Sequence, residues 1–278
     1  MTGGRGLLVH AMLALGAALF LLPVWLVFCA ATQDVGAINR GEIALLPRRD
    51  GLSIFGDVLF GSGPAGADRP VWPMLALSFA MALAIAAGKI VVSVLSAYAV
   101  AFFRFPLRMV CFWVIFATLM LPVEVRIIPT FEVVAGLGLI NSFGGLVVPL
   151  LASATATLLF RQAFLAVPDE LMEAARMDGA GPWRFLTDIL IPTSAANIAA
   201  LFVILFVYGW NQYLWPLLVA THPAQETIVV GIVKMIGTES ATEWNRVMAA
   251  AMLALLPPVL VVLAMQRWFV KGLTDGEK

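Results

Sequence analysis

Charged side chains inside apolar runs are the residues of this sequence best placed to do chemistry. Lys89 lies about two thirds of the way along the apolar run from Met74 to Val100, and Glu124 and Arg126 stand between two prolines near the end of the next run. An ammonium or guanidinium group in such surroundings attracts an anion, and interrupted helices often border a transport cavity. Lys89 could instead snorkel or pair within the protein, and Glu124 and Arg126 could form a structural ion pair, so both interpretations stay open.

Asn211 and Gln212 are uncharged polar residues within a later apolar run. They could line the same pathway, or they could form hydrogen bonds between helices, which are worth about 0.6 to 2 kcal/mol in membranes. The neighbouring rings of Trp210, Tyr213 and Trp215 could form a gate or a stacking wall for a sugar. For these three rings we favour an aromatic belt at the membrane interface.

No motif for nucleotide, metal or covalent chemistry accompanies these residues. The nearest approach to a phosphate-binding loop, GDVLFGSG at 56–63, lacks the lysine that such a loop needs. His10 and His222 are the only histidines, and neither has a partner spaced for a metal. We therefore expect no catalytic residue, no cofactor or metal bound by this chain, and no nucleic-acid partner.

The elements that must position the polar residues are membrane helices. Apolar residues make up 62% of the chain and the mean hydropathy is +0.97, whereas a soluble domain has about 45–50% apolar residues. Runs of about 20 apolar residues match the ~30 Å hydrocarbon core of a bilayer. The sequence predicts one all-α domain over residues 1–278 with six transmembrane helices. The predicted spans are Leu7 to Ala31, Met74 to Val100, Met109 to Val123, Leu139 to Phe160, Ala195 to Ala220, and Met248 to Met265.

Two features of the predicted topology depend on charge. The first span could be a cleaved signal peptide because Arg5 precedes it, but its roughly 25 apolar residues exceed the usual 7–15, so we favour an uncleaved helix. The side that holds both termini collects nine Lys and Arg residues against seven, or against three when the four in the long segment 32–73 are set aside. The positive-inside rule then places both termini in the cytoplasm. Residues 32–73, rich in Gly and Pro, are expected to form an external loop with little regular structure.

The segment 161–194 is then a cytoplasmic loop with an unusual share of charge. Pro168 suits the first position of a helix, and Asp169 and Glu170 place negative charge at the positive end of its dipole. At 100° per residue, the charged side chains of this helix fall on one arc, opposite an apolar arc. The residues of the apolar arc are Leu171, Met172, Ala174 and Ala175.

A glycine corner and a second helix complete this loop. Gly179 allows the positive φ that ends a helix, and Pro182 can open the next one. In that second helix Arg184, Thr187 and Asp188 face away from four apolar residues, and Pro192 is expected to stop it before the fifth span. The four apolar residues are Phe185, Leu186, Ile189 and Leu190. The loop is thus a bracket of two amphipathic helices at the membrane surface, which by themselves could simply connect two spans.

The spacing within the bracket resembles the EAA loop of the membrane subunits of ATP-binding-cassette importers. In that loop Glu-Ala-Ala is followed after three residues by Gly, and after nine more by Ile-x-Leu-Pro. The matching residues here are Glu173, Ala174, Ala175, Gly179, Ile189 and Pro192. Ile191 replaces the usual Leu and conserves its volume. Stretches such as LSAYAVAFFRFPLR, VYGWNQYLWPLL and TEWNRVMAA extend the resemblance, to the smaller permease of carbohydrate-type importers, over nearly the whole chain.

This resemblance implies a type I importer permease fold in the inner membrane of a bacterium. The expected partners are a second, related permease, two copies of a cytoplasmic ATPase that binds ATP and Mg, and a periplasmic binding protein. The EAA loop would sit in a cleft of the ATPase, and segment 32–73 would be periplasmic. The residues expected to couple are Glu173, Ala174, Ala175, Asp178, Gly179, Ile189 and Pro192. The candidates for the translocation path are Lys89, Glu124, Arg126, Asn211 and Gln212.

Several functions remain to be separated. Within the family the resemblance is greatest to permeases for sn-glycerol-3-phosphate, so this compound and glycerophosphodiesters are the expected substrates, with maltose-like or other sugars as the alternative. A secondary transporter that works without an ATPase would carry ions on acidic groups inside its spans. The five acidic residues of the cytoplasmic middle loops all fall in the bracket and not in a span, which disfavours that class. They are Asp169, Glu170, Glu173, Asp178 and Asp188. An intramembrane enzyme would need a nucleophile and base, or a metal cluster, and no such pattern is present in the sequence.

Overall fold

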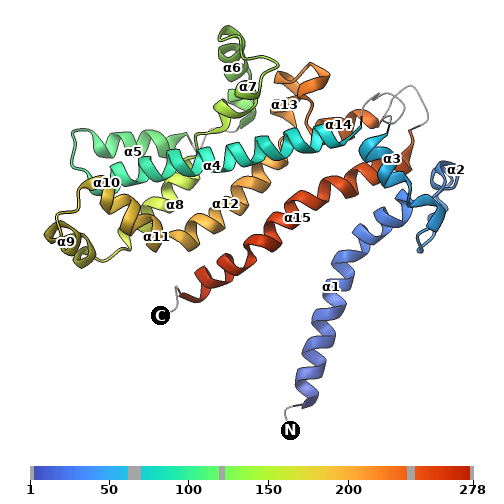
Figure 1. Ribbon diagram of the computed structural model, residues 1–278, viewed down its shortest axis with the longest axis horizontal. Coiled ribbons are helices and arrows are strands. Elements are labelled where there is room, and N and C mark those ends of the chain that lie inside the picture. Colours follow the sequence, from blue (N-terminus) through green and yellow to red (C-terminus); the bar gives the residue numbers. More distant parts are fainter. Residues whose placement is uncertain (1–2, 62–69, 119–122, 237–241, 276–278) are drawn as a thin grey trace. The chain divides into compact units, whose positions relative to one another are not determined.

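The computed structural model describes residues 3–61, 70–118, 123–236 and 242–275, and in these ranges the chain is helical with no β-strand (Figure 1). The prediction of an all-α fold is confirmed. The helices of ten or more residues are α1 (Gly3–Ala31), α4 (Trp72–Phe102), α5 (Arg108–Ala117), α6 (Val123–Gly136), α8 (Ala154–Leu165), α12 (Ala195–Trp210) and α15 (Trp244–Asp275). The shorter elements are α2 (Val35–Asn39), η1 (Arg49–Gly51), α3 (Ile54–Phe60), α7 (Phe143–Val147), η2 (Val148–Leu150), α9 (Asp169–Met177), α10 (Pro182–Arg184), the π-helical turn η3 (Phe185–Leu190), α11 (Ile191–Thr193), α13 (Leu214–Val219), η4 (Pro223–Gln225) and α14 (Ile228–Met235).

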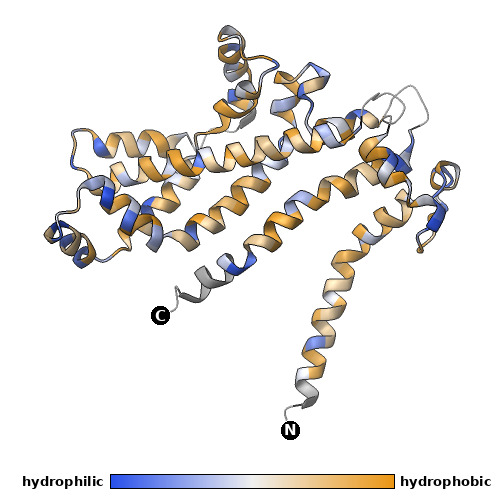
Figure 2. Ribbon diagram, in the orientation of Figure 1, coloured by the Kyte–Doolittle hydropathy of each residue, from blue (hydrophilic) through white to orange (hydrophobic). Residues whose placement is uncertain are grey.

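Three helices are long and apolar enough to cross a membrane within the described part of the chain. They are Gly6–Ala31 in α1, all of α4, and Trp244–Trp268 in α15. Figure 2 shows apolar residues along most of the length of each. These helices correspond to the first, second and sixth spans predicted from the sequence. The described helices therefore contain three clear spans rather than six.

The third and fourth predicted spans are not single continuous helices of membrane length. α5 has ten residues, about 15 Å at 1.5 Å per residue, and Pro122 near its predicted end lies outside the described residues. The fourth span is broken after η2, and the axes of the helices on either side differ by 49°. Ser153 explains the break, because its hydroxyl accepts a hydrogen bond from the Ala156 N–H at 3.3 Å and caps α8.

The fifth predicted span ends early. α12 stops at Trp210 instead of continuing to Ala220, and α13 begins only at Leu214. Pro216 has no N–H to donate to the carbonyl four residues before it, so an uninterrupted helix through this region would leave that carbonyl without its partner. The chain instead turns at Asn211, which caps α12.

The chain divides into two compact units, residues 1–76 with 228–257 and residues 77–227 with 258–278. In the first unit, the Val71 N–H donates to the Val58 carbonyl at 3.0 Å, and both side chains are fully buried. Met74 lies against Gly231 of α14, where an added Cβ would meet the Met74 sulfur at 2.5 Å. The small residue at position 231 thus allows close packing at the start of α4.

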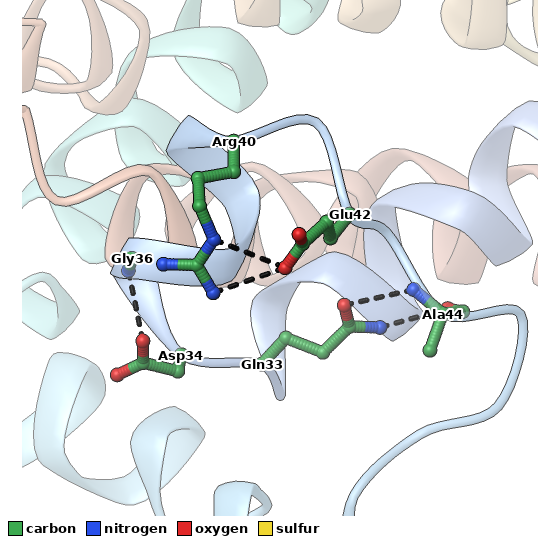
Figure 3. A network of polar contacts seen from close by, with 6 residues as sticks. All are labelled: Gln33, Asp34, Gly36, Arg40, Glu42 and Ala44. Atoms are coloured by element: carbon green, nitrogen blue, oxygen red, sulfur yellow. Dashed lines mark hydrogen bonds and ion pairs between the residues drawn. The ribbon is translucent and has the colours of Figure 1, made fainter.

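The segment that follows α1 contains more regular structure than its Gly and Pro content predicted. α2, η1 and α3 all fall within residues 32–61. Figure 3 shows how side chains fix the first part of this segment: Asp34 accepts from the Gly36 N–H at 2.9 Å and caps α2, and Arg40 pairs with Glu42 at 3.0 Å. The expectation of a loop with little regular structure is therefore wrong for these residues. Their helices are too short to show an apolar period in the sequence, and local side-chain hydrogen bonds such as the Asp34 cap stabilise them.

The second unit is built around α4, α8 and α12. Gly209 of α12 lies so close to α4 that an added Cβ would be 3.0 Å from the Ala82 Cα. Phe160, Phe164 and Phe206 are almost completely buried within this unit. The Ser93 hydroxyl donates to the Ser153 carbonyl at 3.3 Å and joins α4 to the start of α8. Small residues and short polar side chains are the usual means of close helix packing in membranes.

Candidate functional site

A small pocket in the second unit collects three of the five residues predicted for a translocation path. It has a volume of about 160 Å³. Lys89 comes from the middle of α4, Arg126 from the first half of α6, and Gln212 from the turn after α12. Ile127, Thr130, Pro149, Leu150, Ala152, Tyr208, Leu214 and Trp215 complete the lining. We call this the cationic pocket, because among the described residues that line it two are cations and none is an acid.

Lys89 is held in the pocket by an aromatic ring. Its side chain is only 6% exposed, and its Nζ lies 4.0 Å from the centroid of the Tyr208 ring. A cation over the face of a tyrosine is stabilised by about 0.5–2 kcal/mol and keeps its positive charge. The ring therefore offsets part of the cost of burying the ammonium without supplying a negative charge. This placement agrees with a Lys89 that lines a cavity rather than one that snorkels to the membrane surface.

The other polar groups of the pocket are fixed by local hydrogen bonds. The Gln212 amide nitrogen donates to the Tyr208 carbonyl at 3.1 Å, and the Thr130 hydroxyl donates to the Arg126 carbonyl at 2.7 Å. Each bond spans one helical turn, so it holds its side chain against its own helix. Gln212 and Arg126 both line the pocket, and an amide oxygen can accept, and a guanidinium can donate, further hydrogen bonds.

The remaining path candidates and the rings beside them lie elsewhere. Asn211 is exposed and does not line the cationic pocket. Glu124 is in the first turn of α6, but its side chain lies outside the described residues. Trp210 and Trp215 are both 4% exposed, and the Trp215 indole N–H donates to the Gly145 carbonyl at 3.1 Å. The predicted aromatic belt is therefore wrong for these two tryptophans, because each ring packs within the protein.

The bracket, residues 161–194, begins with a helix whose ends are set by its sequence. Pro168 precedes α9 as its cap, so the helix starts one residue later than predicted. Asp169 and Glu170 occupy the first turn and Arg176 the last, as the helix dipole favours. Gly179 has a φ of +73°, and the Ala180 N–H donates to the Ala175 carbonyl at 2.9 Å. This is the Schellman arrangement that the glycine predicted.

The apolar face of α9 is narrower than predicted. Ala175 is buried and Met172 is half-buried, but Leu171 and Ala174 are exposed. Met177 is 83% exposed. The face that packs against the rest of the unit therefore consists of two residues, and the other apolar side chains of α9 remain on the surface beside Glu173, which is exposed too.

The second helix of the bracket follows its predicted pattern but contains a widened turn. Phe185, Leu186 and Leu190 are buried, and Arg184 and Asp188 form an exposed pair at 3.6 Å. The helix passes through Pro192 and ends at Thr193, and the next helix is inclined to it by 75°. The prediction that Pro192 stops the helix is wrong by one residue. The π-helical turn before Pro192 relieves the clash between its ring and the carbonyl four residues earlier.

One hydrogen bond fastens the bracket to α4. The Tyr98 hydroxyl donates to the Pro182 carbonyl at 2.8 Å. The rings of Phe102 and Phe185 meet edge to face with centroids 5.4 Å apart. A pocket of about 370 Å³ lies beside these contacts, with Arg104 and Arg176 in its lining. The end of α4 and the bracket therefore form one packed assembly.

The residues predicted to couple lie mostly on the surface of the bracket. Glu173, Ala174, Asp178, Gly179 and Pro192 are exposed, Ile189 is half-buried and Ala175 is buried. The first five can therefore meet another chain, while Ala175 belongs to the packing of α9. Trp183, which sequence reasoning did not single out, is 67% exposed on the same bracket.

Sequence reasoning also missed residues of the cationic pocket. Thr130 and Tyr208 carry no signal of their own, because a hydroxyl and a ring are ordinary inside apolar helices. Tyr208 lies four residues before Gln212, the spacing of neighbours on one face of a helix, and this spacing could have associated them. Tyr98 gave no signal that could have identified its partner 84 residues away.

Comparisons with known proteins agree with this arrangement. A family described as "Binding-protein-dependent transport system inner membrane component" matches residues 89–275. A protein of Salmonella typhi named sn-glycerol-3-phosphate transport system permease protein is 55% identical over 279 residues, covering 99% of this chain and 98% of the relative. A protein of the same name from Yersinia pestis bv. Antiqua (strain Antiqua) is 53% identical over 278 residues, with the same coverage.

A solved structure has the same fold. One chain of a bacterial ABC transporter involved in the import of the acidic polysaccharide alginate superposes with a TM-score of 0.80. The sequences are 23% identical, and the match covers 95% of this chain and 96% of that chain. The likeness shows that this chain shares the fold of that transporter chain.

Proposed function

This chain belongs to the family of inner membrane components of binding-protein-dependent transport systems, and we propose that it is a permease subunit of an ATP-driven importer of sn-glycerol-3-phosphate and glycerophosphodiesters. The observation that carries the substrate class is the cationic pocket. A phosphate monoester has about 1.5–2 negative charges near neutral pH. Lys89 and Arg126 supply two positive charges, and the described lining residues bring no competing carboxylate.

The size of the pocket agrees with part of such a substrate. At ~30 Å³ per water molecule, its volume of about 160 Å³ is that of about five waters, enough to hold a phosphate group. The glycerol moiety needs further walls, and a second, related permease would supply them. Substrate would then pass between the two permeases by alternating access.

The bracket would join this permease to its source of energy. Glu173 offers an exposed carboxylate to a basic group, and Leu171, Met177 and Trp183 offer exposed apolar surface. Such a surface suits one cleft of a cytoplasmic ATPase, of which the importer would contain two copies. ATP and Mg would bind to those chains, and a periplasmic binding protein would deliver the substrate.

The proposed topology has six spans in one permease domain, residues 1–278, of the bacterial inner membrane, with both termini in the cytoplasm. α1, α4 and α15 cross as single helices. α5 begins the third span and continues towards α6. The bent pair formed by α7–η2 and α8 makes the fourth span. α12, followed by the turn at Asn211 and by α13, makes the fifth. Residues 32–73 are then periplasmic and residues 161–194 cytoplasmic, which places the bracket where an ATPase can reach it.

The test is transport by the complete importer in proteoliposomes. The permease pair, the ATPase and the binding protein are reconstituted together, and uptake of sn-glycerol-3-phosphate is compared with uptake of glycerol and maltose. We expect uptake of the phosphorylated compound only, dependent on ATP. Uptake of maltose in its place would overturn the substrate. Uptake driven by an ion gradient without ATP would overturn the class of transporter.

A further inference from the structure

The segment that follows α2, residues 42–48, runs back along the end of α1. The Trp25 indole N–H donates to the Leu45 carbonyl at 3.0 Å, and the Cys29 thiol donates to the same oxygen at 3.3 Å. Both donors belong to the last two turns of α1. The chain after α2 therefore does not extend away from the membrane helix but returns beside it (Figure 1). We call residues 42–48 the return segment.

Side chains of α1 and its end also satisfy the backbone of the return segment. The Gln33 amide donates to the Ala44 carbonyl at 2.7 Å and accepts from the Ala44 N–H at 3.0 Å (Figure 3). The Arg48 N–H donates to the Thr32 hydroxyl at 3.0 Å. Thr32 and Gln33 are themselves buried. Non-helical backbone can lie at membrane depth only where such partners replace water, and four backbone groups of this segment have them: the Leu45 and Ala44 carbonyls and the Ala44 and Arg48 N–H groups.

The side chains in the middle of the return segment, residues 43–46, are apolar and exposed. Leu45 is 68% exposed and Leu46 is 74% exposed, and Ile43 is exposed between them and α2. A run of exposed large apolar side chains is unfavourable in water and favourable at a membrane surface. The return segment thus combines a satisfied backbone with an oily outer surface.

The depth of the return segment follows from the length of α1. About 20 helical residues cross the hydrocarbon core, so a span that starts near Leu7 leaves the core near Leu26. Trp25 lies at that boundary, six residues and therefore about 9 Å before the end of α1. The Leu45 backbone is hydrogen-bonded between Trp25 and Cys29, and so it lies in the interfacial layer of the membrane rather than above it.

Charged residues lie at both ends of this apolar stretch, with Glu42 paired to Arg40 at its start and Arg48 and Arg49 at its end. Arg48 and Arg49 are exposed and form no ion pair within the described part of the chain. Arginine at this level is suited to the phosphate groups of lipids. Trp25, which is bonded to Leu45, is exposed on α1 together with Leu21 and Leu22, so exposed apolar side chains continue from the return segment onto α1.

We propose that the return segment is a lipid anchor, with Leu45 and Leu46 inserted into the leaflet that holds the C-terminal end of α1 and with Arg48 and Arg49 at its phosphates. In the topology proposed above this is the outer leaflet. The anchor fixes the first external segment against the membrane, independently of the substrate. The occupant it fits is lipid, because the surface continues that of a membrane span and its flanking charges match phosphate.

The test is depth-dependent quenching in the complete importer reconstituted into lipid bilayers. In a Cys111→Ser background, Leu46→Cys carries a fluorescent label; Cys29 is retained because it is fully buried. Leu22→Cys on the exposed face of α1 is the control for lipid contact, and Asn39→Cys at the end of α2 is the control for water contact. Quenching is measured with nitroxide-labelled lipids and with a water-soluble quencher.

We expect the label at position 46 to be quenched by lipid nitroxides as strongly as the label at position 22 and several-fold more strongly than the label at position 39. Stronger quenching from water than from lipid would overturn the anchor. Shielding from both quenchers would also overturn it, because the segment would then be covered by the partner permease. A second measurement places the label on Arg49→Cys and compares the chain with and without the double substitution Leu45→Asp and Leu46→Asp. With the double substitution, the label should be quenched less by lipid nitroxides and more by the water-soluble quencher.

Discussion

At the level of single residues, the cationic pocket is defined by how its lysine is stabilised. Lys89 is buried against the Tyr208 ring, and a ring offsets the cost of burial while leaving the charge free for an anion. A carboxylate in the same place would neutralise the lysine and compete with substrate. The chemistry expected of this pocket is therefore recognition of an anion.

Arg126 tests this chemistry. Arg126→Gln removes the charge but keeps a hydrogen-bond donor, and a hydrogen bond to a charged group is worth about 1.5–3 kcal/mol. At about 1.4 kcal/mol per factor of ten, we expect the KM for sn-glycerol-3-phosphate to rise about 10- to 100-fold. KM is measured from uptake by the reconstituted importer.

Two comparisons make this result specific. Arg126→Lys should retain much of the affinity, and Arg267→Gln on α15, outside the pocket, should leave KM unchanged. A phosphorylated and a neutral substrate are compared in the same vesicles. An equal effect of Arg126→Gln on both would show that Arg126 does not contact phosphate.

Tyr98 is a second residue with a measurable role. Tyr98→Phe removes the hydrogen bond to the Pro182 carbonyl and should lower stability by about 1 kcal/mol. We expect a lower Tm and more ATP hydrolysed per molecule of substrate transported, because the bracket is less firmly held to α4. Tyr213→Phe is the matched control, and an equal loss in both variants would contradict a special role for Tyr98.

At the level of elements, the bracket depends on one backbone conformation. Gly179 has a φ of +73° with open space where a Cβ would stand, whereas Gly181, two residues later, also has open space but an ordinary φ of −70°. A side chain in the left-handed region costs about 1–2 kcal/mol. Because neither position is crowded, a comparison of substitutions at the two glycines isolates the effect of backbone strain.

We expect Gly179→Ala to reduce both thermal stability and ATP-driven uptake, and Gly181→Ala to leave both near the wild-type values. The two variants are compared by thermal unfolding of the purified importer and by uptake in vesicles. If Gly181→Ala lowered stability and uptake as much as Gly179→Ala, the left-handed backbone conformation of Gly179 would not explain the loss.

The helix ends and the buried face of the second helix in the bracket were predictable from the sequence because they depend on local residues. The dipole charges of α9, the glycine corner and the buried face of the second helix all depend on residues within a few positions of one another. The exposure of Leu171 and Ala174 could not be predicted, because it depends on which helices lie against α9. The π-helical turn before Pro192 was missed for a similar reason, since a proline can end a helix or widen it.

The site was predictable only in part. An unusual residue type in an apolar run identified Lys89 and Arg126, and the structure places both in one pocket. Asn211 is the neighbour of Gln212 in sequence, but it does not line the pocket, because α12 ends at Trp210 and the chain turns. Periodicity cannot locate such a turn. The three long spans were predictable from hydropathy. The breaks at Ser153 and Asn211 were not, because hydropathy does not show where an apolar helix is interrupted.

At the level of the whole molecule, the bracket should matter most when the partner chains are present. Glu173→Lys reverses an exposed charge on α9 and should abolish ATP-driven uptake while the permease still folds and reaches the membrane. Uptake is measured in vesicles, and retention of the ATPase is measured by purification through a tag on the permease.

Glu170→Lys makes the same charge change in the first turn of α9. It should cost only about 0.3–1 kcal/mol from the helix dipole and leave coupling largely intact. Undiminished uptake by Glu173→Lys, with the ATPase still bound, would remove the bracket from the coupling path.

α4 carries residues of two functional regions on one uninterrupted helix. Lys89 contributes to the cationic pocket, and Tyr98, nine residues later, is bonded to the bracket. Nine residues of α-helix span about 13.5 Å, and a helix hydrogen-bonded throughout its length transmits axial displacement without shortening. A push on the bracket along α4 therefore reaches Lys89 at full amplitude. In the proposed importer, a movement of the bracket would in this way change the position of Lys89, with no flexible segment between Tyr98 and Lys89.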